Sequence, residues 1–267
     1  MNTLLQVRNL SVIHRKTKQK LVNNVNFSLN KSEILGIIGE SGSGKTLTCR
    51  CILDLLSKKT FDISGEIIFE NKNIISLPEE KLNLIRGNKI ALIMQNPIVA
   101  FDPMTRIGKQ MIESIQIHKN LHKNEILSML EKMLIEFGMK DVHRIFRSFP
   151  SQLSGGMLQR LMIILALSLS PDIIIADEAT TALDIKTQST VLDEFKKIKE
   201  MGISLIIVTH DFGVIAKLAD NVVVMKDGNF IESGTVYDIF DSPKNSYTKE
   251  LLLSNLLKGG KKNDCCK

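Results

Sequence analysis

A glycine-rich segment in the first fifty residues carries the first side chains whose types and spacing could do chemistry. It fits the phosphate-loop pattern and lies between an apolar run, Ile34–Ile38, and a segment of helical length. Its glycines allow backbone N–H groups to turn inward around phosphate oxygens, and the start of the next helix adds a favourable dipole. Nucleotide binding is therefore predicted for Gly39, Glu40, Ser41, Gly42, Ser43, Gly44, Lys45 and Thr46.

Two side chains of this loop are expected to act on the phosphates and their metal ion. Lys45 would contact the β- and γ-phosphates, and the Thr46 hydroxyl would ligate Mg²⁺. The alternative is a glycine-rich turn that fits the pattern by chance. Because glycine makes up only about 7% of average sequences, that coincidence has a probability on the order of one per cent.

An apolar run that ends in two carboxylates supplies the second group. Ile173–Ala176 reads as a strand, and Asp177 and Glu178 follow it directly. A carboxylate at a strand end can hold Mg²⁺ directly or through water, and a second one can polarise an attacking water as general base. In isolation the pair would be interpreted as an acidic strand end in solvent. Together with the phosphate loop it predicts Asp177 as a metal ligand and Glu178 as the base.

A third segment, Leu153–Arg160, precedes a helix and lies ahead of the acidic pair. Ser154 offers a hydroxyl, and Gly155 and Gly156 permit close backbone approach at a helix start, so the segment predicts a second anion site. The alternative is a Ser-Gly-Gly helix cap. Phosphate-loop kinases share Lys45 and the acidic strand end but give no role to this segment, which we call the signature segment.

The surrounding elements are predicted from hydrophobic periodicity. In the first part of the chain, short apolar runs between turn signals indicate strands, and Thr46–Leu56 indicates a helix. From about residue 96 to residue 150, apolar residues recur at helical spacing, which predicts a helical insertion. The expected early strands are Leu4–Val12, Val22–Leu29, Ile34–Ile38, Glu66–Phe69 and Ile90–Met94.

After Leu158 the pattern alternates between helices and strands. Continuous apolar strands separated by helices imply a parallel sheet covered on both faces. Asp227-Gly228 is a hairpin signal that joins the last two strands. The expected elements are a helix through Leu169, the strand Ile173–Ala176, a helix Val191–Glu200, and the strands Ser204–Val208, Asn221–Met225 and Asn229–Glu232.

The composition restricts the remaining classes of protein. The chain has 267 residues, 43% hydrophobic and 24% charged, which is ordinary for a soluble protein. Its longest strongly apolar run, Leu161–Leu169, is far shorter than the roughly 20 residues that span a bilayer, so no transmembrane segment is expected. The first residues show no basic leader followed by an apolar region, which favours a cytosolic protein.

Neither the net charge of +6 nor the cysteines indicate a nucleic-acid or metal protein. Half of that charge lies in residues 258–267, which we interpret as a basic, disordered tail. Cys49 and Cys51 lie in one segment, and Cys265 and Cys266 are adjacent, so neither pair resembles a disulfide framework or a spaced zinc site.

The order of phosphate loop, signature segment, Asp-Glu pair and a downstream histidine resembles the ATPase subunits of ATP-binding-cassette transporters over nearly the whole chain. The resemblance implies an α/β fold, with a phosphate-loop NTPase (RecA-like) core, an antiparallel β subdomain and an inserted α-helical subdomain at about 96–160. It also implies one cassette domain over residues 1–257, with ATP and Mg²⁺ as the bound groups.

Further site residues follow from this resemblance. Gln95 resembles the glutamine-loop residue, which touches Mg²⁺ or the lytic water, and His210 resembles the switch histidine at the γ-phosphate. His14 stands where the family has an aromatic residue that stacks on adenine, and Ala179 stands where the family has proline. The loop that crosses the dimer interface corresponds to Ala182, Leu183 and Asp184, and the residues that reach the partner's ATP correspond to Leu153, Ser154, Gly155, Gly156 and Gln159.

The resemblance also implies partners. Two cassettes stack head to tail, so that the signature segment of one chain completes the ATP site of the other; ATP closes the dimer and hydrolysis reopens it. The second ATPase subunit is expected to be a different chain, with a homodimer as the alternative. Two membrane permease subunits and an extracellular solute-binding protein complete the assembly at the cytoplasmic face of the membrane, and no nucleic acid is expected.

Several short segments resemble the branch that imports dipeptides, oligopeptides and nickel. Many peptide importers continue with spaced cysteines after the Tyr247-Thr248 pair, whereas this sequence offers only Cys265 and Cys266 there. We therefore expect an importer of nickel or a metal–metallophore complex, with peptide import as the alternative and a non-transport cassette protein as a third possibility. The segments that carry this resemblance are Ile93–Pro97, Ala100–Pro103, Gly108–Gln110, Met157–Arg160 and Ser242-Pro243.

Overall fold

The computed structural model describes residues 3–181 and 183–260 of the chain. The chain divides into two compact units. One unit, called here the terminal unit, runs from the start through Pro78 and resumes at Ser204, and the other, the central unit, is Glu79–Ile203. The predicted loop crossing a dimer interface includes Ala182, which lies outside the described residues, as does the tail from residue 261.

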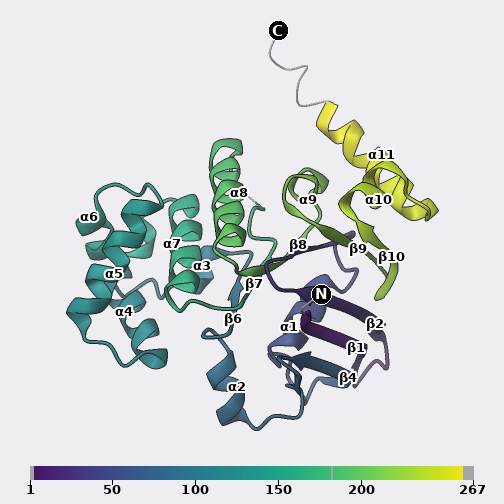
Figure 1. The fold of residues 1–267 in the computed structure, drawn as a ribbon, viewed down its shortest axis with the longest axis horizontal. Helices are drawn as coiled ribbons and strands as arrows, with labels where there is room; N and C mark the ends of the chain where they lie inside the picture. Colours follow the sequence, from purple (N-terminus) through teal and green to yellow (C-terminus); the bar gives the residue numbers. More distant parts are fainter. Residues whose placement is uncertain (1–2, 182, 261–267) are drawn as a thin grey trace. The chain divides into compact units, whose positions relative to one another are not determined.

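An antiparallel sheet in the terminal unit has the strand order β2-β1-β4-β5 (Figure 1). Buried apolar residues alternate with exposed ones along β1, which is the pattern of a strand with one face in the core. Both β1 and β4 extend beyond the predicted apolar runs, because their outer residues are polar or half-buried and carry no hydrophobic signal. The strands are β1 Thr3–His14, β2 Lys20–Asn30, β4 Phe61–Phe69 and β5 Lys72–Asn73.

Parallel strands form the second layer of the terminal unit. The predicted strand β3 (Ile34–Ile38) pairs in parallel with both β8 (Ser204–Thr209) and β9 (Asn221–Lys226), and all five of its residues are buried. A hairpin joins β9 to the antiparallel β10 (Asn229–Thr235), as the Asp-Gly signal predicts. The parallel core thus follows from the continuous apolar runs, which need cover on both faces.

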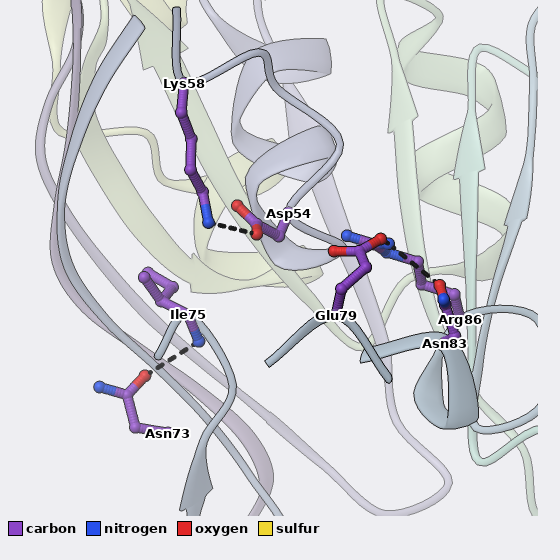
Figure 2. A network of polar contacts seen from close by, with 7 residues as sticks. All are labelled: Asp54, Lys58, Asn73, Ile75, Glu79, Asn83 and Arg86. Carbon is purple, nitrogen blue, oxygen red and sulfur yellow. Dashed lines mark hydrogen bonds and ion pairs between the residues drawn. The ribbon is translucent and has the colours of Figure 1, made fainter. Parts of the chain in front are cut away.

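Helices of the terminal unit flank these strands. Helix α1 (Lys45–Ile52) ends earlier than predicted, because Asp54 adopts a left-handed conformation with φ of 48°. The Asp54 carboxylate pairs with Lys58 Nζ at 2.8 Å (Figure 2). The later helices are α9 Phe212–Leu218, α10 Val236–Asp241 and α11 Ser246–Gly260, so the first three residues of the predicted tail lie within α11.

The central unit combines two parallel strands with a group of helices. Strand β6 (Ile90–Ile93) pairs in parallel with β7 (Ile173–Asp177). Helices α4, α5 and α6 gather beside α7 (Figure 1), as the helical spacing of this region predicts. Before β6, Arg86 pairs with Glu79 across helix α2 (Figure 2). The helices are α2 Glu79–Ile85, α3 Pro97–Ala100, α4 Ile107–His118, α5 Lys123–Glu136, α6 Val142–Arg147, the 3₁₀ turn Pro150–Gln152, α7 Gly155–Ser168 and α8 Ile185–Glu200.

Helix α8 begins at Ile185 rather than at Val191, where the apolar periodicity starts. Its first turns are exposed or half-buried, so they carry no hydrophobic pattern, and the helix start is fixed instead by Asp184 as N-cap. Within residues 3–181 and 183–260, no helix is both long and apolar enough to cross a lipid bilayer.

Candidate functional site

The phosphate loop closes around its own lysine. Lys45 is only 4% exposed, and its Nζ donates to the backbone oxygens of Gly39 at 2.9 Å and Glu40 at 2.7 Å. The ammonium group is thus held by carbonyl oxygens of the loop at the start of α1. A buried cation attracts anions strongly, because little solvent screens its charge.

Two glycines of the loop are required for different reasons. Both have left-handed backbones, with φ of 83° at Gly42 and 108° at Gly44, which side chains adopt at a cost. A Cβ on Gly44 would lie 2.7 Å from Met225 Cε and 2.8 Å from the Leu21 backbone oxygen, whereas one on Gly42 would meet nothing within 4 Å. Packing therefore fixes the base of the loop, and its tip stays open to a ligand.

This donor set fits a nucleotide phosphate. The loop offers backbone N–H groups, the Lys45 ammonium and the half-buried Thr46 hydroxyl at a helix start, which is the chemistry that cradles phosphate oxygens. When bound, ATP supplies the γ-phosphoryl group that water attacks. The side chains named here would hold it and neutralise its charge.

His14, the residue predicted at the adenine, has an aromatic neighbour that the sequence did not reveal. The Phe61 ring lies edge-on to the His14 ring, with centroids 5.7 Å apart and planes at 78°. The His14 Nδ1 accepts from the Thr17 backbone N–H at 3.2 Å. Phe61 opens β4, and cross-strand pairing with β1 brings it opposite His14, a contact that no local pattern signals.

His210 follows β8 directly and is exposed. The next residue, Asp211, caps α9 by accepting from the Gly213 N–H at 2.8 Å. His210 therefore lies between a buried parallel strand and a capped helix, at the carboxyl end of the strand. Ligands of open α/β sheets bind at such strand ends.

A tyrosine of the terminal helix lies close to the phosphate loop. Tyr247 is 8% exposed, and Lys226 Nζ lies 4.3 Å from the centre of its ring. Burial raises the pKa of Tyr247, while interaction with the Glu40 backbone lowers it. Tyr247 is therefore a buried residue of α11 that packs beside Lys226 of β9.

In the central unit, the acidic pair lies at the end of β7. Asp177 is 7% exposed, and Glu178 has a left-handed backbone with φ of 49°, which is uncommon for a residue other than glycine. A proline at position 179 would restrict the preceding residue to extended backbone. Ala179 places no such restriction on the backbone of Glu178.

Gln95 and Glu178 contact one another. Gln95 Nε2 donates to Glu178 Oε2 over 2.8 Å, although 83 residues separate them in the chain. Parallel pairing of β6 with β7 produces this contact, because the two side chains follow the same end of neighbouring strands. Thr181 also turns toward the pair, since its Oγ1 lies 3.4 Å from Glu178 Oε2. The structure therefore unites two of the predicted catalytic residues.

The signature segment forms the start of α7. Ser154 is the N-cap, and its Oγ accepts from the Met157 N–H at 3.2 Å, so the helix-cap alternative also describes this serine. A Cβ on Gly155 would meet nothing within 4 Å, so this glycine is open to a ligand. Leu153 is half-buried, whereas Gln159 is 1% exposed and is not presented at the surface with Ser154.

Asp184 and the half-buried Leu183 precede α8. The Asp184 carboxylate accepts from Thr187 Oγ1 at 2.6 Å and from the Thr187 N–H at 3.0 Å. These hydrogen bonds, the side-chain one first, lower the pKa of Asp184. Thr187 was missed in the sequence, although an aspartate three residues before a threonine is a helix-cap spacing that could have identified the helix start.

The predicted site residues are divided between the two units. The phosphate loop, His14 and His210 belong to the terminal unit. Gln95, the signature segment and the acidic pair belong to the central unit, together with Leu183 and Asp184. Each unit thus carries part of the predicted set of site residues.

Comparison with known proteins decides the family. The family model described as ABC transporter matches residues 22–181, which include the phosphate loop, the signature segment and the acidic pair. The chain belongs to the ABC transporter family. As a member of this family it is an ATP-binding protein whose chemistry is ATP hydrolysis coupled to transport, which confirms the function class expected from the motifs.

Curated members of the ABC transporter family match over almost the whole chain. The metal-staphylopine import system ATP-binding protein CntD of Staphylococcus aureus is 49% identical over 255 residues, covering 94% of this chain and 92% of CntD. The oligopeptide transport ATP-binding protein OppD of Lactococcus lactis is 38% identical over 257 residues, covering 94% of this chain and 75% of OppD.

A solved ABC transporter cassette confirms the fold class. The dimeric structure of a bacterial cassette aligns with a TM-score of 0.77 and 26% identity, covering 87% of this chain and 99% of that chain. The expected α/β fold, a phosphate-loop NTPase core with an antiparallel sheet and inserted helices, is thereby borne out.

Proposed function

We propose that this chain is the ATP-hydrolysing subunit of an ABC importer for nickel or a metal–metallophore complex. The observation that carries this proposal is the difference in identity between relatives. The metal-staphylopine import protein is 49% identical over 255 residues, whereas the oligopeptide transport protein is 38% identical over 257 residues. Both relatives align over 94% of the chain, so the difference is not an effect of coverage.

Peptide import is the second candidate. It is favoured by the repeated occurrence of oligopeptide transport proteins among the relatives, including one of Bacillus subtilis that is 39% identical. The ATPase motifs serve either cargo equally, since hydrolysis takes place at the nucleotide and not at the cargo. Only transport measurements separate these two candidates.

For the catalytic step, Glu178 acts as general base and Gln95 orients the water. The 2.8 Å hydrogen bond between these side chains supports this assignment, because both can then reach one water molecule. His210 contacts the γ-phosphate, and Thr46, Gln95 and Asp177 hold Mg²⁺. Oxygen ligands of this kind are those that Mg²⁺ prefers. His14, beside Phe61, stacks on the adenine.

The chain works as one of two stacked cassettes. Ser154, Gly155 and Gly156 of one subunit complete the ATP site of the other, and Leu183 and Asp184 lie at the same interface. The open space around Gly155 supports this arrangement, because backbone at a helix start is then accessible to an anion. A different ATPase chain is the expected partner, and the two units of this chain together form a single cassette domain over residues 1–257.

An apolar groove in the central unit supports a membrane partner. The groove has a volume of about 580 Å³ and is lined by Ile98, Val99, Phe101 and Leu158 among others. Ile98 and Val99 are 63% and 73% exposed. Both lie shortly after Gln95 in the sequence. Exposed apolar groups of this kind mark an interaction site. We assign the groove to one of two permease subunits, which hold the chain at the cytoplasmic face and receive cargo from an extracellular binding protein.

Uptake by cells tests the cargo. Cells that lack the gene receive the wild-type chain, Glu178→Gln, or Glu136→Gln as a control at an exposed glutamate of α5. Uptake of labelled nickel, as the free ion and as its staphylopine complex, is measured beside uptake of a labelled dipeptide. Loss of nickel uptake only in Glu178→Gln supports the proposal. Loss of dipeptide uptake alone would assign the chain to peptide import.

A further inference from the structure

The first turn of α8 packs against the signature segment within the central unit. A Cβ built on Gly156 would lie 2.5 Å from Thr187 Cγ2 and 3.3 Å from Thr187 Oγ1. Real Cβ atoms essentially never come closer than 3.0 Å to a heavy atom to which they are not bonded and that lies outside their own residue and its chain neighbours. The Gly156 backbone therefore lies directly on the Thr187 side chain, and position 156 has no room for a larger residue. Gly155, in contrast, has open space around it.

The same threonine is held from its other side by Asp184. Its Oγ1 donates to one carboxylate oxygen over 2.6 Å, and its backbone N–H donates to the other over 3.0 Å. Both bonds are charge-assisted and therefore stronger than neutral ones. The hydroxyl that faces Asp184 and the methyl group that faces Gly156 belong to one side chain, so each contact fixes the position of the other.

This shared side chain makes the two contacts interdependent. Threonine is branched at Cβ, so only a few χ1 rotamers are open to it in a helix. A rotation that broke the bond to Asp184 would also turn Cγ2 relative to Gly156. Displacement of Asp184 would therefore change the packing at the start of α7, where Ser154 is the N-cap.

We propose that Thr187 is a positioning residue that couples Asp184 to the signature segment of the same subunit. The proposal rests on the proposed function, in which both segments meet the partner subunit at the nucleotide. Closure of the dimer against Asp184, the N-cap of α8, then sets the position of Ser154 and Gly155 at the adjacent start of α7. In this proposal Thr187 acts through Asp184 and Gly156 and not on the nucleotide.

Two substitutions separate the contacts that Thr187 makes. Thr187→Val keeps a methyl group against Gly156 and removes the hydroxyl from Asp184. Thr187→Ser keeps the hydroxyl and removes the methyl group. Thr190→Val and Thr190→Ser are matched controls, because Thr190 lies on the same helix and its Oγ1 donates to the Lys186 backbone oxygen at 3.1 Å.

The first measurement is steady-state ATPase activity of the assembled transporter. Both Thr187 variants are expected to lower kcat about 5- to 20-fold, with less than about a twofold change in KM for ATP, since the phosphate loop is untouched. Both Thr190 controls should keep the wild-type kcat. Unchanged kcat in Thr187→Val would overturn the coupling, because packing alone would then explain the residue. An increase in KM that accounts for the whole loss would also overturn it.

The second measurement needs no partner. Hydrogen exchange in the isolated full-length chain without nucleotide reports the local stability of the start of α7. Amides of residues 155–160 should exchange about 3- to 10-fold faster in Thr187→Ser than in wild type or Thr190→Ser, and at the wild-type rate in Thr187→Val. Unchanged exchange in Thr187→Ser would overturn the contact. If the wild-type chain hydrolysed no ATP in any assembly, the proposed function would be wrong. The exchange measurement would still show whether Thr187 supports the start of α7 through its contact with Gly156.

Discussion

The phosphate loop and the signature segment are both glycine-rich and both begin a helix, yet they are built differently. The phosphate loop encloses its charge, because Lys45 is 4% exposed and bonds to carbonyl oxygens of its own loop. The start of the signature segment faces outward, because Ser154 is exposed and Gly155 has open space around it. The phosphate loop is a closed anion-binding loop, and the start of the signature segment is an open surface that a partner subunit can cover.

The supports of the two segments differ as well. The base of the phosphate loop is packed against β9 and β2 through Gly44, and the Gly228 N–H donates to the Ser43 backbone oxygen at 2.9 Å. The signature segment is supported by the neighbouring helix α8, where Thr187 lies against Gly156 and Glu194 pairs with Arg160. Preorganised donors bind an anion with little cost of rearrangement. We infer that nucleotide affinity depends on the phosphate loop, and that turnover depends on groups of the central unit.

Glu178→Gln gives the largest expected effect and separates binding from turnover. The change removes the general base but keeps the size of the side chain, so kcat should fall by about 10²- to 10⁴-fold while ATP still binds. The variant should also trap a closed dimer in the presence of ATP. Single-turnover hydrolysis and size-exclusion chromatography with ATP measure both effects. Rapid turnover in this variant would show that Glu178 is not the general base.

Lys45→Ala tests the claim that the phosphate loop determines affinity. Loss of a buried cation beside the phosphates should weaken ATP binding by the isolated chain about 100-fold. Lys249→Ala, which changes an exposed lysine of α11, is the control and should bind like wild type. Titration with a fluorescent ATP analogue gives both affinities. An unchanged affinity in Lys45→Ala would contradict the claim that the phosphate loop determines the affinity for ATP.

Ser154→Ala tests the opposite half of the comparison. The isolated chain should bind ATP within about twofold of wild type, while ATPase activity of the assembled transporter falls about 10- to 100-fold. Loss of the N-cap should also lower the free energy of unfolding by about 1 kcal/mol. Ser151→Ala, at an exposed serine just before the segment, is the control for both measurements. Full activity in Ser154→Ala would show that Ser154 does not contribute to the ATP site of the partner subunit.

A buried ion pair between the last residue of the signature segment and α8 gives the smallest expected effect. Arg160 Nε donates to Glu194 Oε1 over 2.6 Å, and Arg160 also donates to the Phe137 backbone oxygen. Burial raises the pKa of Glu194, although Arg160 opposes this. The folded state therefore binds the proton more tightly than the unfolded state.

Its consequence is a pH dependence of stability with a defined sign. Because the pKa of Glu194 is higher in the folded state than in the unfolded state, the free energy of unfolding decreases as the pH rises between these two pKa values. Above the folded-state pKa, the free energy of unfolding no longer changes through this group. Glu194→Gln lacks this titration. Denaturant unfolding of both chains between pH 4 and pH 8, about the range in which a shifted carboxyl titrates, should show wild type losing stability relative to the variant. A relative gain with rising pH would contradict the assignment.

Much of the local structure could be predicted because its signal is local. The strand β3 was predicted with its exact bounds, since four apolar residues around Gly36 are followed by a glycine-rich turn. The helix α8 was predicted too short, because its first turns are exposed or half-buried and only the later ones show apolar periodicity. The aromatic neighbour of His14 was missed, since Phe61 reaches it only through pairing of β1 with β4.

The sequence by itself determined the order and the chemistry of the motifs, because residue type and covalent spacing decide which backbone can turn, cap a helix or hold a charge. Tertiary structure alone decided which of these groups touch. Gln95 meets Glu178 across 83 residues, and Gly156 meets Thr187 across a helix pair. Such contacts depend on the pairing of strands and the packing of helices. These are long-range choices that no short segment of the chain encodes.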